Sequence, residues 1–299
     1  MTLPGAVRTA DAVRAAAEHG KICALAARAQ RDLQGCADRH PELFAARPFD
    51  GALFGTVSLA NAFGSPDDSA AQIEIANRTS LWIFALDWLV DYKARSRAEV
   101  EEVLAGCRAV GDGGDPVPGR PLTAFLAEIR DRLAEAPGFA ELRPVWRDEL
   151  ERMLRSMALE WEWKSAGAAG RPTFEEYLDN ADNFGSTWVN IAHWISTGGP
   201  SWTDHLDDLR AASREVQRVL RLLNDLATYE RDVEWGDLNA LLLGTGREAV
   251  TERIAVLVER CRELIGALHG PCPREAVYLE RQIGYSIGFY GATDYWGAL

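Results

Sequence analysis

The stretch NDLATYERD, which begins at Asn224, places three oxygen-bearing side chains on one helical stripe. Asn224, Thr228 and Asp232 recur every four residues, so on a helix their side chains stack on one face. Amide, hydroxyl and carboxylate oxygens suit Mg²⁺, which usually completes its octahedron with water and substrate phosphates. Arg231 lies beside the stripe and could reach a phosphate oxygen. The alternative is a solvated face on which Asp225 and Asp232 are ordinary surface charges.

A second acidic pattern, LDWLVD from Leu86, lies in an apolar stretch that reads as a buried helix from Ile75 to about Asp91. Asp87 and Asp91 are four residues apart, so both carboxylates project from one helical face. Two like charges on an apolar helix are unfavourable unless a cation neutralises them, and a hard divalent ion would do so. The alternative is an exposed carboxylate pair at a helix end that leads into Lys93.

Helical periodicity dominates the elements that must position these side chains. Apolar residues recur at spacings of three and four, and no sustained alternation indicates a sheet. We therefore predict an all-α fold, with about ten helices in a single domain over residues 1–299, packed as a bundle around a central cavity. The clearest amphipathic segments are residues 13–33, 98–110, 122–136, 146–164 and 248–268, and Gly- and Pro-rich breaks fall at 111–121, 136–138, 165–172, 198–200 and 270–273.

Composition narrows the classes of function. The chain has 299 residues, of which 47% are hydrophobic, and a formal net charge of −13. An acidic chain lacks the basic footprint that nucleic acid or an anionic membrane surface needs. Five dispersed cysteines without a paired spacing indicate reduced thiols, and no signal peptide or membrane span is recognisable. We expect a cytoplasmic enzyme that would meet an anionic substrate through metal ions.

Together these motifs resemble those of class I terpene synthases. NDLATYERD matches the family's second metal-binding motif, (N/D)D-x-x-(S/T)-x-x-x-(E/D), and is followed by a turn at Gly236 and by Asn239. The resemblance implies that Asn224, Thr228 and Asp232 are metal ligands and that Arg231 contacts diphosphate. LDWLVD fits the position of the aspartate-rich motif, with Leu86 where the family commonly has a first aspartate. Asp87 is then the main ligand there, with Asp91 beside it.

The resemblance covers roughly residues 54–299 and extends to the segment between the motifs. TFEEYLDNADNFGSTWVNIAHWI is similar to the family's helix that breaks near the active site, here at Gly185 or Ser186. The chain departs from the family in two places: no Lys or Arg occurs from Thr173 to Pro200, and Asp294-Tyr295 stands where an Arg-Tyr pair is usual. We expect Mg²⁺ and Arg231 to hold the diphosphate, with help from Arg221 or Lys93.

Aromatic side chains near the motifs are candidates for lining a cavity that holds a carbocation. Aromatic faces attract cations, more strongly in a desolvated pocket, and such a pocket must exclude water. Each of these residues could instead be ordinary core. The candidates are Trp82, Phe84, Trp88, Trp161, Phe184, Trp188, Trp194, Tyr285, Phe289 and Tyr290.

The resemblance implies an enzyme that uses three Mg²⁺ ions to remove diphosphate from a prenyl substrate and then cyclises or rearranges the cation. The missing sensor arginine and the EYLDN element resemble bacterial enzymes that take labdane-type diphosphates such as copalyl diphosphate; geranylgeranyl diphosphate or, for a sesquiterpene cyclase, farnesyl diphosphate are the alternatives. No DxDD motif occurs, so a separate class II cyclase would supply a bicyclic substrate. A homodimer is a family expectation. A chain-elongating prenyltransferase and a non-enzymatic helical interaction protein are the remaining rivals.

Overall fold

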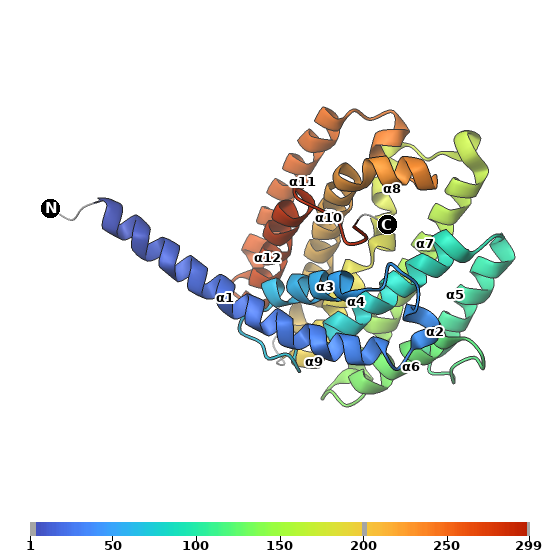
Figure 1. The fold of residues 1–299 in the computed structure, drawn as a ribbon, viewed down its shortest axis with the longest axis horizontal. Helices are drawn as coiled ribbons and strands as arrows, with labels where there is room; N and C mark the ends of the chain where they lie inside the picture. Colours follow the sequence, from blue (N-terminus) through green and yellow to red (C-terminus); the bar gives the residue numbers. More distant parts are fainter. Residues whose placement is uncertain (1–3, 199–201, 298–299) are drawn as a thin grey trace.

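A computed structural model describes residues 4–198 and 202–297, and within these ranges the secondary structure is helical. Helices α3 to α12 form a bundle, and α1 lies along its edge (Figure 1). The break expected at 198–200 falls largely outside the described residues. The α-helices are α1 (Pro4–Ala37), α2 (Pro41–Phe44), α3 (Gly51–Gly64), α4 (Glu74–Asp87), α5 (Arg97–Gly111), α6 (Pro121–Leu133), α7 (Phe139–Ala166), α8 (Phe174–Asp179), α9 (Ser186–Thr197), α10 (Leu206–Trp235), α11 (Arg247–Leu268) and α12 (Pro273–Tyr290).

The all-α prediction is confirmed, with twelve α-helices in the described ranges instead of about ten. Four of the five amphipathic segments expected from periodicity lie within helices, and the fifth, 122–136, extends three residues beyond the end of α6 at Leu133. The apolar stretch from Ile75 differs from the prediction, because α4 ends at Asp87 and continues as the π-helix η1 (Trp88–Lys93). The wider turn is closed by a bond of 2.9 Å from the Ala94 amide to the Leu89 carbonyl. Such π-turns are frequent at functional sites.

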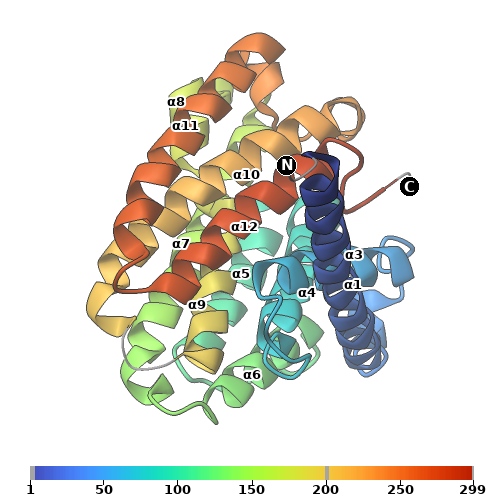
Figure 2. The ribbon, with the colours of Figure 1, turned by 90° about the vertical axis from the view of Figure 1, so that its left-hand side faces the viewer.

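Helix α4 lies at the centre of the bundle and contacts α3, α6 and α9. Leu81, Trp82 and Leu86 on this helix are fully buried, so apolar burial on most of its surface holds α4 in place. Helices α10, α11 and α12 pack side by side as a second group (Figure 2). These two groups of helices supply the two acidic motifs.

Only part of α1 packs against the bundle. Its second half contacts α3, where Ile22 and Leu25 are buried and Gln30 Nε2 donates to the Gly51 carbonyl at 2.8 Å. From Asp11 to Gly20 every residue is exposed, and this part of the helix extends beyond the body (Figure 1).

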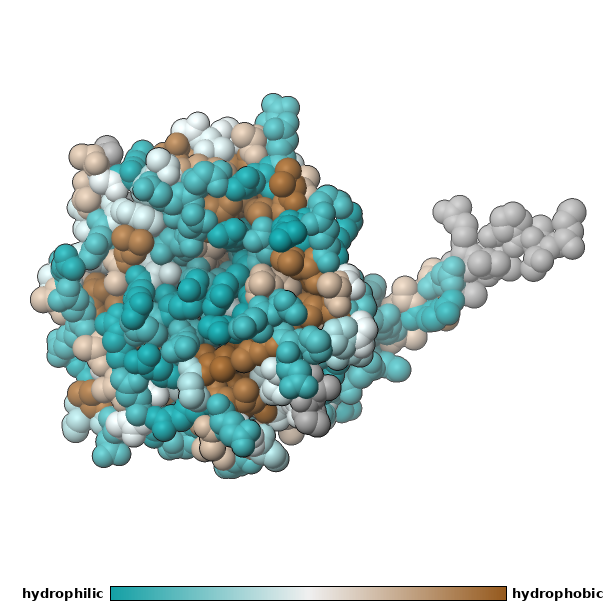
Figure 3. Space-filling model, turned by 180° about the vertical axis from the view of Figure 1, so that it is seen from behind, coloured by the Kyte–Doolittle hydropathy of each residue, from teal (hydrophilic) through white to brown (hydrophobic). Residues whose placement is uncertain are grey.

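The face shown in Figure 3 is mostly hydrophilic, with small groups of apolar residues between charged ones. This fits the acidic composition of the chain. Among the helices that the structure describes, none combines the length and the apolar character needed to cross a bilayer. The five cysteines are all free thiols, and four of them are buried.

Candidate active site

One cavity of about 830 Å³ lies between the two groups of helices, and both acidic motifs border it. Its ionisable lining consists of six acidic and four basic residues, an excess of negative charge in a recess that is otherwise largely apolar. The acidic residues are Asp87, Asp91, Glu160, Asp225, Asp232 and Asp237, and the basic ones are Arg95, Lys164, Arg221 and Arg231.

The first acidic wall is the junction of α4 and η1. Asp87 and Asp91 are half-buried and both border the cavity. Burial raises the pKa of Asp87 to about 6, and burial together with the charge of Asp87 raises the pKa of Asp91 well above its usual range. Within the described residues neither carboxylate has an ion-pair partner within 4 Å, although the Lys164 ammonium donates to the Asp91 carbonyl at 3.1 Å. The two carboxyl groups are hydrogen-bonded to each other, and the charges of Arg221 and Lys164 act on them from beyond ion-pair distance.

The second acidic wall is the C-terminal third of α10. Asn224 and Asp232 border the cavity, whereas Thr228 lies beneath the surface between them, 1% exposed. The Thr228 hydroxyl donates to Asp232 Oδ2 at 2.6 Å, and Asn239 Nδ2 donates to the same oxygen at 2.9 Å. Burial raises the pKa of Asp232, and these two hydrogen bonds lower it. Asp232 is therefore oriented from behind and is not a solvated surface charge.

Asn239 links α10 to the segment that follows it. Its Nδ2 also donates to the Asp225 carbonyl at 2.8 Å, and its Oδ1 accepts from the Leu241 amide at the start of the next short helix. Gly236 makes the preceding turn possible, because its φ of 70° is unfavourable for residues with a Cβ. Gly236 thus turns the chain back, so that Asn239 can hydrogen-bond to Asp225 and Asp232 on α10.

Arg221 is committed to a buried network. Its guanidinium donates to Glu160 Oε1 at 2.6 Å and to Tyr177 Oη at 2.7 Å, and it lies 3.4 Å from Asp225 Oδ1. Tyr177 in turn donates to Asp225, whose pKa burial raises to about 7. Arg221 also borders the cavity, so its help in holding diphosphate stays a prediction, although in this structure its donors are bonded to protein oxygens.

Arg231 lies at the edge of the cavity and is paired with Asp294. Their closest atoms are 2.5 Å apart, and the guanidinium also lies 5.4 Å from the centre of the Trp235 ring. Asp294 stands where the family resemblance led us to expect an arginine, and its carboxylate pairs with Arg231. Lys93, the other basic candidate, points elsewhere: its ammonium lies over the Trp88 and Tyr92 rings at 5.2 and 5.3 Å.

The helix break occurs where the sequence placed it. The short helix η3 (Ala181–Phe184) and α9 meet at Gly185, whose φ is 75°. A Cβ on Gly185 would come within 2.6 Å of Ile83 Cδ1, so close packing also requires glycine. Ser186 borders the cavity and Gly185 lies behind it. The Thr187 amide freed by the break is bonded by Gln217 Oε1 at 3.0 Å.

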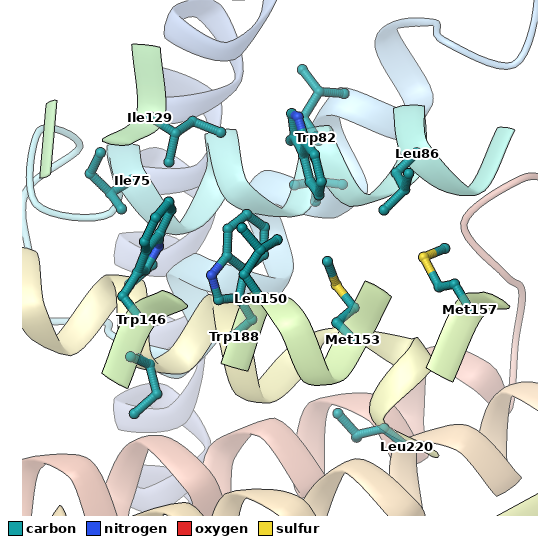
Figure 4. Close-up of a cluster of buried hydrophobic side chains, with 14 of the residues drawn as sticks. Ile75, Trp82, Leu86, Ile129, Trp146, Leu150, Met153, Met157, Trp188 and Leu220 are labelled. Carbon is teal, nitrogen blue, oxygen red and sulfur yellow. The ribbon is translucent and has the colours of Figure 1, made fainter. Parts of the chain in front are cut away.

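The aromatic candidates divide between cavity and core. Phe84, Trp88, Trp161, Phe184, Tyr285 and Tyr290 border the cavity. The prediction for Trp82 and Trp188 is wrong: both are nearly completely buried and pack edge to face 5.2 Å apart in the apolar core, where Trp146 also lies (Figure 4). Trp194 is likewise buried core. Phe289 stacks on Tyr285 at 5.4 Å and does not itself border the cavity.

Several residues that border the cavity were not predicted from the sequence. Lys164 is ion-paired with Asp237, Glu160 holds Arg221, and Tyr295 and Trp296 of the C-terminal segment border the cavity. Glu160 and Lys164 are four residues apart in EWEWK, a spacing that puts both on one face of α7. That spacing was the one available signal, because the C-terminal contacts depend on distant parts of the chain.

The donor set suits a cation that is completed by substrate. In the described parts of the chain, no three His, Cys, Asp or Glu side chains are arranged as a full metal site. The α10 motif offers one carboxylate, one amide and one hydroxyl, and Mg²⁺ usually takes one or two carboxylates and fills its remaining positions with phosphate oxygens and water.

Comparison with known proteins places the chain in a family. Residues 78–263 match the family described as terpene synthase family 2, C-terminal metal binding. The chain is also 28% identical over 276 residues to ent-pimara-9(11),15-diene synthase from Streptomyces sp. (strain KO-3988), an alignment that covers 89% of this chain and 91% of that protein.

Two solved structures have the same fold. Linalool/nerolidol synthase from Streptomyces clavuligerus, in complex with 2-fluorogeranyl diphosphate, superposes with a TM-score of 0.71 at 19% identity, covering 89% of this chain and 94% of that one. Isoprene synthase from grey poplar, with three Mg²⁺ ions and dimethylallyl-S-thiolodiphosphate, superposes with a TM-score of 0.67 at 15% identity, covering 90% of this chain and 55% of that one. Because the family match spans more than half of the sequence and includes both acidic motifs, the chain belongs to terpene synthase family 2 and is a class I terpene synthase.

Proposed function

We propose that this enzyme uses Mg²⁺ to ionise a C20 prenyl diphosphate and then cyclises or rearranges the carbocation to a diterpene. The substrate would be a labdane-type diphosphate such as copalyl diphosphate, or geranylgeranyl diphosphate. The observation that carries the proposal is the division of one cavity into an acidic part, bordered by Asp87, Asp91 and Asp232, and a remainder in which apolar and aromatic side chains predominate. A recess of this kind suits a substrate with a charged head and a hydrocarbon body.

Asp87 and Asp91 would hold Mg²⁺ on one wall, and Asn224, Thr228 and Asp232 would hold it on the other. The fit rests on charge and donor type, because the first pair makes no ion pair within 4 Å to a described residue and the second set offers three kinds of oxygen. Bound there, the metal would act as a Lewis acid on the diphosphate oxygens. The grey poplar relative, solved with three Mg²⁺ ions, supports the same number here.

Cationic side chains of the protein would share the diphosphate. Arg231 borders the cavity beside Asp232, and phosphate oxygens would replace Asp294 as acceptors of its N–H groups. Lys164 borders the cavity across from α10 and is held by Asp237 and the Asp91 carbonyl. These fixed donors would stabilise negative charge as it develops on the leaving group.

The aromatic part of the cavity would hold the cation away from water. Phe84, Trp88 and Phe184 border this part, and aromatic faces attract cations. Trp296 covers it from the C-terminal segment, with its ring 5.2 Å from Phe84 and 6.1 Å from Trp88. Exclusion of water prevents premature capture of a reactive intermediate.

Two observations support a C20 substrate over farnesyl diphosphate. The cavity volume of about 830 Å³ lies in the upper part of the range of about 300–1,000 Å³ for small-molecule pockets. The relative aligned along most of its length is named for a pimaradiene, a C20 hydrocarbon. If the substrate is bicyclic, a separate class II cyclase must make it.

The test is a comparison of substrates with and without metal. The purified enzyme is incubated with copalyl, geranylgeranyl or farnesyl diphosphate, with Mg²⁺ or with EDTA, and released diphosphate and extracted products are measured. The proposal predicts Mg²⁺-dependent release and a cyclic or rearranged C20 product. Preference for farnesyl diphosphate would make the enzyme a sesquiterpene cyclase. Equal release in EDTA, or no release from any substrate, would overturn the proposal.

A further inference from the structure

The end of the cavity farthest from the acidic walls contains polar side chains among apolar ones. On α4, Ser80 lies seven residues before Asp87, and on α12, Gln282 lies eight residues before Tyr290. At the α-helical rise these intervals are about 10 Å and 12 Å. Tyr290 is hydrogen-bonded to Asn224 on the second acidic wall. Ser80 and Gln282 therefore lie about two to three helical turns away from the acidic walls, at the end of the cavity that we call its floor. A hydrocarbon-binding floor would be expected to be apolar.

A third helix, α3, meets this floor through Asn61. Helices α3 and α12 are held together by Tyr285 Oη, which donates to the Thr56 carbonyl at 3.4 Å, and by Arg281 Nε, which donates to the Phe63 carbonyl at 2.5 Å. Asn61 lies between these two contacts along α3 and borders the cavity.

Asn61 presents an unpartnered acceptor. Its Nδ2 donates to the Val57 carbonyl at 3.3 Å and to Asn77 Oδ1 at 2.8 Å, with Ser80 Oγ at 3.4 Å. The Val57 carbonyl can only accept a hydrogen bond, so the nitrogen of the Asn61 amide, and not its oxygen, faces Val57. Asn61 Oδ1 has no partner among the described residues, although the side chain is only 6% exposed.

Ser286 presents an unpartnered hydroxyl on the facing helix. The residue is 7% exposed, borders the cavity one turn after Gln282, and makes no hydrogen bond to a described residue. Gln282 is paired with Asn190 through both of its amide atoms, at 2.8 and 3.0 Å, and makes no hydrogen bond to Ser286. Both groups are reached from the cavity, so a polar molecule held there would supply the hydrogen bonds that the described residues leave unmade.

We propose that Asn61, Ser80 and Ser286 form a subsite for one hydroxyl oxygen at the floor of the cavity, and that the product carries this oxygen. The oxygen belongs either to water or to a hydroxyl group already on a labdane-type substrate. It would donate to Asn61 Oδ1 or Ser80 Oγ and accept from the Ser286 hydroxyl. The inference rests on the proposed function, because it places this oxygen beside the hydrocarbon end of a bound C20 diphosphate.

For water, the chemical step is balanced within the cavity. A lone pair on the water oxygen forms the C–O bond to the cationic carbon, and the positive charge moves to the resulting oxonium. The oxonium transfers its proton to Asn61 Oδ1, since an amide oxygen is more basic than a neutral alcohol, and the proton passes to solvent when the product leaves. No oxidant or reductant is needed.

The test measures the oxygenated product made per diphosphate released. Wild-type enzyme with Mg²⁺ is incubated in H₂¹⁸O with copalyl or geranylgeranyl diphosphate, and separately with a hydroxylated labdane-type diphosphate, followed by mass spectrometry. An ¹⁸O-labelled alcohol identifies water as the source. Retained ¹⁶O, with kcat/KM highest for the hydroxylated substrate, identifies the substrate. Either result supports the subsite.

Variants connect the result to these side chains. Asn61→Leu and Ser286→Ala should each lower the alcohol fraction, or the preference for the hydroxylated substrate, about fivefold or more, the loss expected from one hydrogen bond. Ser286→Ala breaks no described hydrogen bond, so it tests the idea even if Asn61→Leu fails to fold. Ser58→Ala is the matched control: it removes another buried, unpartnered hydroxyl on α3 that does not border the cavity.

Two outcomes would overturn the inference. Diphosphate release that yields only oxygen-free products, together with no preference for the hydroxylated substrate, would remove the subsite and leave the proposed function intact. Absence of diphosphate release from every substrate would overturn the proposed function and this inference with it.

Discussion

Arg221→Met is expected to lower thermal stability far more than it weakens diphosphate binding. Arg221 is 8% exposed and its guanidinium is bonded to Glu160 and Tyr177, with Asp225 at 3.4 Å. Removing the cation leaves two buried carboxylates without their partner, and breaking such a pair typically costs about 3–5 kcal/mol. For a chain of this size we expect Tm to fall by roughly 5–15 °C.

Arg231→Gln is the matched variant, since Arg231 lies ten residues further along α10 at the edge of the cavity. Its pair with Asp294 is partly exposed, so its loss should change stability by no more than about 1 kcal/mol while raising the KM for the diphosphate substrate. Thermal melts and kinetics on both variants separate the two roles. Adding Glu160→Gln to Arg221→Met should restore part of the lost stability. If Arg221→Met melts like the wild type and only the KM rises, Arg221 is a diphosphate ligand and the reasoning fails.

Three further variants test the scaffold around the site. Asn239→Ala removes a helix cap and a hydrogen bond to Asp232, so we expect a loss of about 1–2 kcal/mol and a higher Mg²⁺ requirement in a metal titration; no change in either would contradict the role of Asn239. Gly185→Ala adds a Cβ at φ 75° and 2.6 Å from Ile83, so urea unfolding should show a loss of about 1–3 kcal/mol, and an equally stable variant would rule out that strain. Burial, and then the positive charge of Arg274, lowers the pKa of His193 from 6.5 to about 3. The unfolded chain therefore gains a proton below pH 6.5 that the folded chain does not, and stability should fall by up to about 1.4 kcal/mol per pH unit from pH 6.5 towards 3. His193→Gln should flatten this fall, and unchanged pH slopes would show that His193 titrates normally in the fold.

Local patterns in the sequence predicted the helices and the position of the site well. Spacing of four along α10 put Asn224 and Asp232 on one face, and the structure places both on the cavity wall. The break at Gly185 followed from a glycine inside an otherwise helical pattern. These features depend on neighbouring residues, so the sequence carries them directly.

Features that depend on contacts between distant segments were beyond the sequence. The partners of Arg221 lie 61 and 44 residues away, so nothing local separated it from Arg231. Trp82 and Trp88 are both aromatic residues of the same segment, yet packing against Trp188 takes one into the core while the π-turn leaves the other at the cavity. The helices that pack around α4 decide which of its apolar side chains point into the core.

The central claim is that two acidic walls share metal ions with a diphosphate across one cavity, and turnover and melting of Asp87→Asn test it most directly. Asp87 makes no ion pair with a described residue and is hydrogen-bonded to Asp91, so asparagine keeps a hydrogen-bonding side chain there and deprives the site of a metal ligand. We expect Mg²⁺-dependent diphosphate release to fall by about 100-fold or more, as for loss of a group that stabilises developing charge, and the Tm of the metal-free protein to stay equal or rise. Wild-type turnover, or a lower Tm, would contradict it.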